Sequence, residues 1–250
     1  MAFNCGQCGG ALDLAVGARF GICPFCGSSV YFDRSMAVLH FVAEQTLDEP
    51  KARGKLQAWM AGNATVKGLE RDAVVGDAVL TYFPLWRFVS ADSSGERQWC
   101  EPARASAAAG LGEVPLSGGA LRHVSAQDMV TLPLAEPEVR LDSALEWLAR
   151  RGVQRSGIRE TSLVHIPLYE FPYTWGGRSW KAAVDAISGR VLTGAYPAKS
   201  ETPYVGLAVA AVLGFFCLGI VTDGALLRFA LFAAASVPLG LVALAVARKV

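Results

Sequence analysis

Two runs near the C-terminus contain no charged side chain, which makes them the most apolar part of the chain. Residues 204–222 and 229–247 are nineteen residues each, and the six residues 223–228 link them. About 20 apolar residues in a helix cross the hydrocarbon core of a bilayer, which is about 30 Å thick. A buried helix of a soluble protein would keep a polar stripe, and neither run has one. The pattern predicts a transmembrane hairpin of two helices at residues 201–250.

The residues in and around these runs indicate an inert anchor with both ends in the cytoplasm. Ion and substrate pathways need ionisable side chains within the membrane, and neither run contains one. The link carries Arg228, offset by Asp223, whereas the basic residues that flank the hairpin are Arg190, Lys199, Arg248 and Lys249. Because cytoplasmic flanks carry the excess of Lys and Arg, both termini are expected on that side. Small residues suited to close helix packing recur every four positions at Gly206, Ala210 and Gly214.

Between residues 34 and 200 the pattern predicts an α+β domain in which one series of elements occurs twice. Each series has a helix that carries a tryptophan, a strand that contains proline, a glycine turn and a second strand. The first series covers about 48–100 and the second about 141–197. The alternative to an internal duplication is chance similarity between aromatic-rich strands.

Both helices have start and stop signals and a short apolar side. The first is expected from Asp48 to Gly62 and the second over 141–152. The apolar side is formed by Leu56, Trp59 and Met60 in the first helix, and by Leu145, Trp147 and Leu148 in the second.

The strands that follow each helix are expected at 79–89 and 163–175, with turns at 92–95 and 176–177. Set side by side, these residues match: Trp59 with Trp147, Pro84 with Pro167, Trp86 with Tyr169, Phe88 with Phe171, and Trp99 with Trp180. Since proline belongs at a sheet edge or a strand start, each first strand is expected to be irregular. A further hairpin is predicted around Asp185, Ser188 and Gly189, and residues 101–140 are expected to form a connecting loop or a poorly ordered excursion.

The strands are rich in aromatic residues, for which we consider two interpretations. The favoured one is a core packed between the sheet and the two helices, and the other is a binding face for a partner or for lipid. The set contains Tyr82, Trp86, Phe88, Tyr169, Phe171, Tyr173, Trp175 and Trp180.

Four cysteines in two tight pairs open the chain. Cys5 and Cys8 form the first pair, Cys23 and Cys26 form the second, and fourteen residues separate the pairs. A two-residue spacing lets both thiolates of a pair bind one metal ion, and four sulfur ligands suit a structural, tetrahedral Zn²⁺. Two disulfides or a redox pair are the alternative, but a redox C-x-x-C normally lies in a βαβ setting. The pattern therefore predicts a zinc ribbon at 1–33, with turns eased by the glycines Gly6, Gly9 and Gly27.

The order of these parts resembles a group of poorly characterised bacterial membrane proteins with an N-terminal zinc ribbon. The motifs that carry the resemblance are the four cysteines, Trp59 to Gly62, and Tyr82-x-Pro84-x-Trp86-x-Phe88. The segment 171–197 also resembles the hairpin that leads into the membrane in that group. The resemblance implies a multi-domain protein of the bacterial inner membrane, with a ribbon at 1–33, an α+β domain at 34–200 and a transmembrane hairpin at 201–250.

No catalytic pattern stands out in the sequence. The histidines His40, His123 and His165 fall in unrelated segments, and His165 alternates with apolar residues as a structural residue in a strand would. Cys100 lacks an identifiable base, and Gly110 and Gly112 lack the third glycine of a dinucleotide site. The absence of a phosphate-loop motif argues against an ATP-driven motor.

We therefore expect a non-enzymatic, membrane-anchored adaptor that holds one structural Zn²⁺ and presents a protein-binding surface in the cytoplasm. The alternative is a membrane-tethered nucleic-acid binder, because zinc ribbons often contact DNA or RNA. The whole chain has 23 basic and 22 acidic residues, and the ribbon has Arg19 and Arg34 against Asp13 and Asp33. Phosphate contacts supply most non-specific affinity, so this balance disfavours nucleic acid.

Overall fold

The computed structural model describes residues 3–13, 18–33, 36–92, 95–114, 116, 121–199, 202–221 and 224–249. They form two compact units, which we describe separately. The first contains Met1–Trp59 and Ala73–Tyr196, and the second contains Met60–Asp72 and Pro197–Val250. Of the predicted features, Arg34 and the middle of the turn at 92–95 lie outside the described residues.

The first unit contains two sheets and most of the helices. Its strands are β1 (Phe3–Asn4), β2 (Ala11–Leu12), β3 (Phe20–Ile22), β4 (Ser29–Asp33), β5 (Met36–Ala43), β6 (Val74–Val75), β7 (Val79–Asp92), β8 (Gly95–Pro102), β9 (Leu121–His123), β10 (Ile158–Trp175), β11 (Arg178–Asp185) and β12 (Val191–Leu192). Its helices are α1 (Glu49–Met60), η1 (Leu111–Glu113), α3 (Asp128–Thr131), α4 (Leu141–Arg150) and η3 (Arg155–Gly157). The second unit contains α2 (Leu69–Asp72), α5 (Thr202–Val221) and α6 (Ala225–Lys249).

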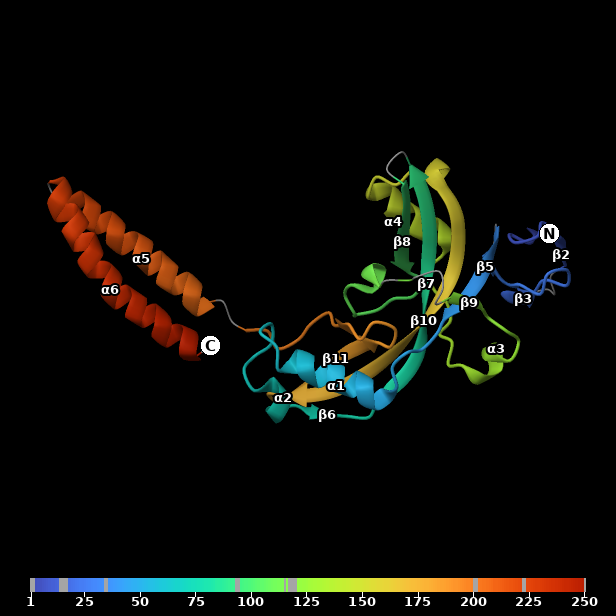
Figure 1. Ribbon diagram of the computed structural model, residues 1–250, viewed down its shortest axis with the longest axis horizontal. Coiled ribbons are helices and arrows are strands. Elements are labelled where there is room, and N and C mark those ends of the chain that lie inside the picture. Colours follow the sequence, from blue (N-terminus) through green and yellow to red (C-terminus); the bar gives the residue numbers. More distant parts are fainter. Residues whose placement is uncertain are drawn as a thin grey trace. The chain divides into compact units, whose positions relative to one another are not determined.

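The long strand β10 organises a mixed sheet of ten strands. One edge of β10 pairs with β7 and then with β6, and its other edge pairs with β5 and then with β11. Among the named strands of the described residues, only the β5–β10 pairing is parallel, and the remaining strand pairs of the sheet are antiparallel. Figure 1 shows β7 and β10 curving together through the middle of this unit. The strands β1 and β2 form a separate small sheet.

The predicted ribbon is continuous with this sheet. Strand β3 pairs with β4, and β4 pairs with β5, which in turn pairs with β10. The predicted boundary between residues 33 and 34 stays a prediction, but hydrogen bonds cross it. Structure at the N-terminus is therefore supported by more than its own few strands.

Helices α1 and α4 each cover one end of the sheet, as their apolar sides predict. In α1 the side chains of Ala52, Leu56 and Met60 are buried, and in α4 those of Leu141, Ala144 and Leu148 are buried. Figure 1 shows α1 along β10 and β11, and α4 beside β7 and β8. Leu148 is buried as expected, whereas Trp147 is 37% exposed and the unpredicted Ala144 is buried.

Pro84 and Pro167 lie within β7 and β10 rather than at a strand start, and each lies where the pairing along one edge of its strand ends. The carbonyl of Pro84 accepts a hydrogen bond from Ala103 N (3.0 Å), and that of Pro167 accepts one from Ala186 N (2.9 Å). The N–H and C=O of a strand residue point to the same neighbour. The missing N–H therefore faces the place where the pairing with β8 or β11 ends, so no ladder bond is lost.

The two series of elements make the same hydrogen bonds with each other. The carbonyl of Ala103, after β8, accepts from the backbone N–H groups of Glu138 and Val139, which precede α4 (both 2.8 Å). The carbonyl of Ala186, after β11, accepts from those of Thr46 and Leu47, which precede α1 (3.0 and 2.9 Å). Each helix thus approaches the strands of the other series.

The hydrogen-bond register corrects two of the matches made from sequence. The parallel pair Val42↔His165 of one series has its counterpart in Leu134↔Tyr82 of the other. With the elements placed this way, Trp147 corresponds to Lys55 rather than Trp59, and Trp180 to Arg97 rather than Trp99. The matches of Pro84 with Pro167 and of Trp86 with Tyr169 agree with the register. Aromatic residues alone had suggested a shifted alignment.

Part of the segment 101–140 is ordered, which the prediction of a connecting loop did not anticipate. Strand β9 pairs with β5, and α3 follows it. The Asp128 side chain of α3 accepts hydrogen bonds from both Ser125 and Arg122, and burial leaves this carboxylate 8% exposed. The Ala-rich and Gly-rich composition of residues 101–140 did not predict this contact between polar side chains.

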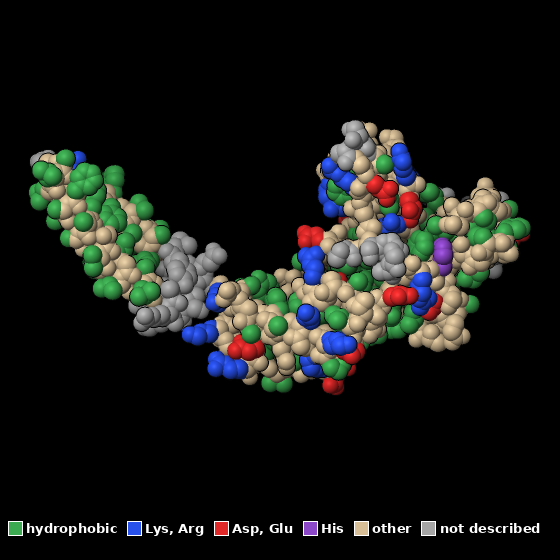
Figure 2. Space-filling model, in the orientation of Figure 1, with side chains coloured by type: hydrophobic (Ala, Val, Ile, Leu, Met, Phe, Trp, Pro, Cys, Tyr) green, Lys and Arg blue, Asp and Glu red, His purple; other side chains and the backbone are tan. Residues whose placement is uncertain are grey.

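The second unit contains the apolar C-terminal helices. One helix in the described part of the chain is long and apolar enough to cross a membrane, at Ala225–Leu244 of α6, whereas the apolar stretch of α5, Gly206–Ile220, is shorter. In Figure 2 hydrophobic side chains are distributed along the coloured part of these helices. The rings of Phe215 and Phe232 lie 5.3 Å apart, so the helices touch there. Gly206 and Gly214 have no close neighbour, so the small-residue ridge is not the contact between α5 and α6.

Candidate metal centre

Both cysteine pairs lie in turns of the same form. The N–H of Gly9 donates to Cys5 O (2.8 Å), and the N–H of Gly27 donates to Cys23 O (2.9 Å). Gly9 and Gly27 follow the second cysteine of each pair with φ of 74° and 73°, a left-handed conformation that suits glycine. Gly6 is not among the residues with positive φ, so its predicted role in the turn is not needed. These turns point the two thiols of each pair to the same side.

The two turns bring all four thiols together. The Sγ atoms of Cys5, Cys8, Cys23 and Cys26 lie within 4.8 Å of one another, and the cross-turn pairs Cys5–Cys26 and Cys8–Cys23 are 3.7 Å apart. A tetrahedral zinc site with bonds of about 2.3 Å has sulfur–sulfur edges of about 3.8 Å. The separations fit one metal ion and are too long for disulfide bonds. Among the described residues, this is the only group of this kind.

The site has a buried side and an exposed side. Cys5 and Cys23 are buried, whereas Cys8 and Cys26 are exposed. Hydrogen bonding with the Ser28 side chain and backbone lowers the pKa of Cys26 to about 6, whereas the hydrogen bond with the Cys26 thiol contributes most to raising the pKa of Cys8, to about 12. With four protein ligands no position remains open for substrate, so the arrangement suits a structural metal.

The surroundings of the site combine a small core with an exposed apolar side chain. Cys5, Cys23, Leu12 and Val30 are buried together, and Leu39 of β5 packs against them. Phe25, between the cysteines of the second pair, lies over the backbone of Gly10 and is 70% exposed. The turn therefore places an aromatic ring on the surface next to the metal ligands.

The structure also brings together two histidines that the sequence left in unrelated segments. His40 of β5 and His165 of β10 are fully buried, and His40 Nε2 lies 2.9 Å from His165 Nδ1. The chain of contacts extends to the Ser29 hydroxyl, 3.3 Å from His40 Nδ1, and to the carbonyl of Ala135, 2.9 Å from His165 Nε2. His123 lies apart from this chain, with its ring 4.5 Å from that of Phe41. The alternating pattern around His165 predicted a strand, but the strand that contains His40 and the pairing of the two histidines were not predicted.

The hydrogen bonds of this pair fix the position of each proton. A carbonyl only accepts, so His165 Nε2 carries a hydrogen and donates to Ala135 O. The neutral His165 ring then accepts at Nδ1 from His40 Nε2, and His40 Nδ1 accepts from the Ser29 hydroxyl. Burial lowers the pKa of His40 to about 2 and that of His165 to about 4, so both rings are neutral at physiological pH. No nitrogen of this pair is left to bind a metal.

The remaining candidate residues are structural. Burial raises the pKa of the Cys100 thiol to about 11, so the thiolate needed for nucleophilic attack is scarce at neutral pH. Six aromatic side chains of the strands are buried and form core, whereas Trp175 and Trp180 are half-buried. The buried six are Tyr82, Trp86, Phe88, Tyr169, Phe171 and Tyr173.

Comparisons with protein-family models, with curated proteins and with solved structures found no match for this chain. The resemblance to bacterial zinc-ribbon membrane proteins therefore rests on the motifs in the sequence. Of these, the four cysteines have the geometry of a metal site that such a ribbon requires.

Proposed function

We propose that the protein is a membrane-anchored adaptor whose N-terminal zinc ribbon presents a binding surface for another protein. The observation that carries this proposal is the closed set of four cysteine thiols, beside which Phe25 is 70% exposed. A metal with four protein ligands rigidifies a short segment without offering a catalytic position. An exposed aromatic ring on a rigid turn is a favourable anchor in a protein interface.

Zinc is the metal we propose for this site. Four thiolates in a tetrahedral arrangement favour Zn²⁺ among abundant divalent ions, and zinc brings no redox chemistry of its own. Reduced cysteines agree with a cytoplasmic location for the ribbon.

The anchor in this proposal is a hairpin of two spans, α5 and α6, in a bacterial inner membrane. The contact between Phe215 and Phe232 and the uncharged runs of both helices support it. The excess of basic residues outside the hairpin supports cytoplasmic termini. Cysteine accessibility tests this topology: in a background without Cys217, a cysteine at Gly224 should react only with a reagent added outside, and one at Lys199 only from inside.

The proposal includes an internal duplication of the α+β region. It is supported by the matching hydrogen bonds at Ala103 and Ala186 and by the matching parallel pairs at Tyr82 and His165. Exchange of helices between the two copies links them into one rigid scaffold. Such a scaffold suits a protein that holds a partner near the membrane rather than one that acts on a substrate.

Crosslinking followed by mass spectrometry in the native membrane tests the adaptor role. The change Phe25→Ser should keep the metal and abolish crosslinks between the ribbon and its partner. Val130→Ser is a matched control, because Val130 is also an exposed apolar residue (83%) but lies on α3, outside the ribbon segment 1–33.

Two outcomes would contradict the adaptor proposal. Partner crosslinks unchanged in both Phe25→Ser and Cys23→Ser would show that the ribbon is not the contact surface. Salt-dependent binding of duplex or single-stranded nucleic acid that Arg19→Glu abolishes would favour the nucleic-acid alternative instead.

A further inference from the structure

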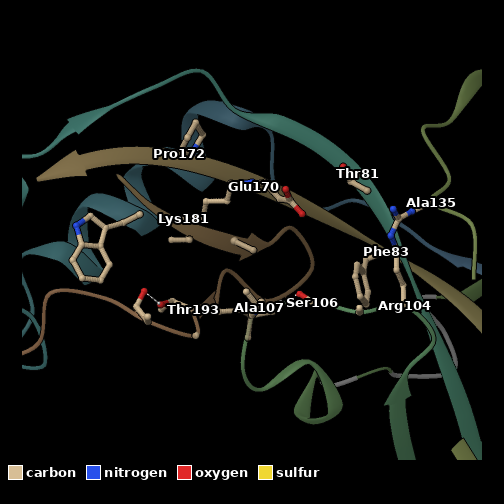
Figure 3. A pocket seen from close by; sticks show the side chains of 18 of the residues that line it. Thr81, Phe83, Arg104, Ser106, Ala107, Ala135, Glu170, Pro172, Lys181 and Thr193 are labelled. Atoms are coloured by element: carbon tan, nitrogen blue, oxygen red, sulfur yellow. Dashed lines mark hydrogen bonds between the residues drawn. The ribbon is translucent and has the colours of Figure 1, made fainter. Parts of the chain in front are cut away.

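An open groove of about 770 Å³ lies on one face of the sheet, where β10 pairs with β11 (Figure 3). Its floor is formed by side chains at alternate positions of two strands: Thr81 and Phe83 of β7, and Glu170 and Pro172 of β10. Alternate residues of a strand point to the same face, so this part of the groove is a sheet face. In Figure 3 the Ser106 and Ala107 segment and Thr193 lie across from that face.

The walls of the groove differ from its floor, because they are formed by consecutive residues. The runs 104–108, 179–183 and 192–195 line it without alternation. Consecutive residues cannot all present side chains to one side of a strand, so the groove follows main chain at these places. Most side chains in these runs are small, which leaves the backbone accessible.

One of these walls is a strand edge without a partner. Strand β12 pairs with β11 only at Ala183 and Val184. Within the described residues, no strand pairs with the outer edge of β11 from Ser179 to Ala182. A strand edge of this kind presents N–H and C=O groups that can pair with another chain.

The chain itself leaves this edge open by turning away after β12. Gly194 approaches the main chain of Ala107 so closely that a side chain at this position would overlap the Ala107 carbonyl oxygen. Residues after Leu192 consequently follow the 104–108 segment rather than β11. The ladder that β12 begins could be continued along β11 by another chain in the same antiparallel direction.

The groove contains charged side chains of both signs, Arg104, Lys181 and Glu170. The cation that bears on an acidic ligand is Lys181. Arg104 is paired with Glu138 at 3.1 Å, whereas Lys181 is exposed and forms no ion pair with the described residues. The ammonium group of Lys181 is therefore available to a carboxylate from outside.

From these features we infer that the groove binds an extended segment of a partner protein, which adds as a strand to the edge of β11 and pairs an acidic side chain with Lys181. Main-chain hydrogen bonds give affinity in this mode of recognition, and alternate side chains facing the floor give specificity. The identity of the ligand as part of a protein rests on the proposed adaptor function; the site itself does not. It is separate from the metal centre and supplies a second contact surface.

The test begins with a phage-displayed library of random heptapeptides selected on the full chain in lipid nanodiscs. Selected peptides are then synthesised with a fluorophore, and each has an analogue with N-methylated backbone amides and another with its acidic residue replaced by the amide. We expect the parent peptides to bind and both analogues to bind at least about tenfold more weakly. N-methylation removes main-chain hydrogen bonds to the β11 edge, and the amide removes the charge that pairs with Lys181. Hydrogen exchange at residues 178–183 should slow on binding.

Two variants of the chain test the location. Lys181→Glu should weaken the parent peptides about tenfold or more and reverse the preference for an acidic side chain. Ala105→Trp should block the groove while leaving the metal content unchanged. Lys67→Glu, which changes an exposed lysine outside the groove in the same way, should have no effect.

Several outcomes would overturn the inference. These are a selection that yields no binder, binding that survives both Lys181→Glu and Ala105→Trp, or equal binding of the N-methylated analogues. Concentration-dependent dimerisation that Ala105→Trp abolishes would instead assign the edge to a second copy of the chain. Because Cys23→Ser and Phe25→Ser leave the groove intact, peptide binding should persist in them. Loss of ribbon crosslinks with retained peptide binding thus separates the two proposals.

Discussion

The two helix-and-hairpin series of the first unit share their hydrogen bonds but differ in what is attached to them. Ala103 and Ala186 accept the same pair of backbone bonds, and Ala52 and Leu56 take the places of Ala144 and Leu148. The interactions that both series make are backbone hydrogen bonds and contacts of buried side chains. These interactions pack the helices against the sheet.

The differences between the series are concentrated at one place. Where the first series has Tyr82 beside a single bridge to Leu134, the second has His165 beside the eight-residue strand β5. Strand β5 contains His40, which contacts His165. It also pairs with β4, the strand that follows the second cysteine turn. The comparison indicates that the fold depends on the buried and backbone contacts that both series make. The metal centre depends on strands β4 and β5, which are present beside only one of them.

The largest expected effect comes from removing the metal, which should affect the cysteine turns and the short strands next to them. Cys23→Ser should reduce metal content from one zinc per chain to near zero, because structural zinc in small peptides contributes about 10–16 kcal/mol of binding free energy. Metal analysis of purified protein checks this. Cys217→Ser, on α5, is the matched control and should retain one zinc. Less than half a zinc per chain in the unchanged protein would contradict the assignment.

Hydrogen exchange in Cys23→Ser would show which elements lose structure when the metal is absent. Hydrogen exchange should rise in β1, β2 and β3, whose short strands lack a core without the metal. It should remain slow in β10 and in the part of β5 that pairs with it. Faster exchange throughout the first unit would mean that the shared framework also depends on the metal.

The second largest effect is expected from acid, through the histidine pair that only one series has. The pKa of His40 is lowered to about 2 and that of His165 to about 4, whereas an unfolded histidine titrates near 6.5. Between pH 6.5 and 4 the unfolded chain binds the protons first, so the free energy of unfolding falls as pH decreases. Each pH unit costs about 1.4 kcal/mol for each histidine in this window.

Urea unfolding followed by tryptophan fluorescence, between pH 7.5 and 4.5, measures this loss. The double change of His40→Leu with His165→Leu should flatten the dependence, because it removes both titrating groups at once. An equally steep dependence in the double variant would assign the acid sensitivity to other residues.

The sequence predicted those elements of the fold that depend on residues close together in the chain. Asp48 marks the start of α1, the glycine pair 176–177 marks a turn between β10 and β11, and the cysteine spacing marks the metal centre. The pairing of strands that are distant in the sequence could not be predicted. The contact of His40 with His165 and the open edge of β11 depend on which strands become neighbours, and no residue type signals that choice.

A third comparison concerns the buried leucines that occupy equivalent places in the two helices. Leu56 and Leu148 are both fully buried, so Leu56→Ala and Leu148→Ala should each lower the free energy of unfolding by about 2–5 kcal/mol. Similar losses from urea unfolding would support equivalent roles. Leu145→Ala, at a partly buried position of α4, should cost less.

The smallest expected effect distinguishes how the two helices begin. The Asp48 side chain accepts a bond from the N–H of Lys51 (3.0 Å) within its own turn, whereas the first N–H of α4, at Leu141, donates to Asp33 of β4 (2.8 Å). Asp33 is 8% exposed and Asp48 is largely exposed, so water replaces the bond of Asp48 more easily.

Asp33→Ala should therefore lower the free energy of unfolding by about 1.5–3 kcal/mol, the usual worth of a hydrogen bond to a charged group, and Asp48→Ala by only a fraction of that. Asp33→Asn, which keeps an acceptor, should recover part of the loss. Hydrogen exchange should rise at the start of α4 in Asp33→Ala and at the start of α1 in Asp48→Ala. Equal losses in the two variants would mean that α4 does not depend on β4 for its N-terminal cap.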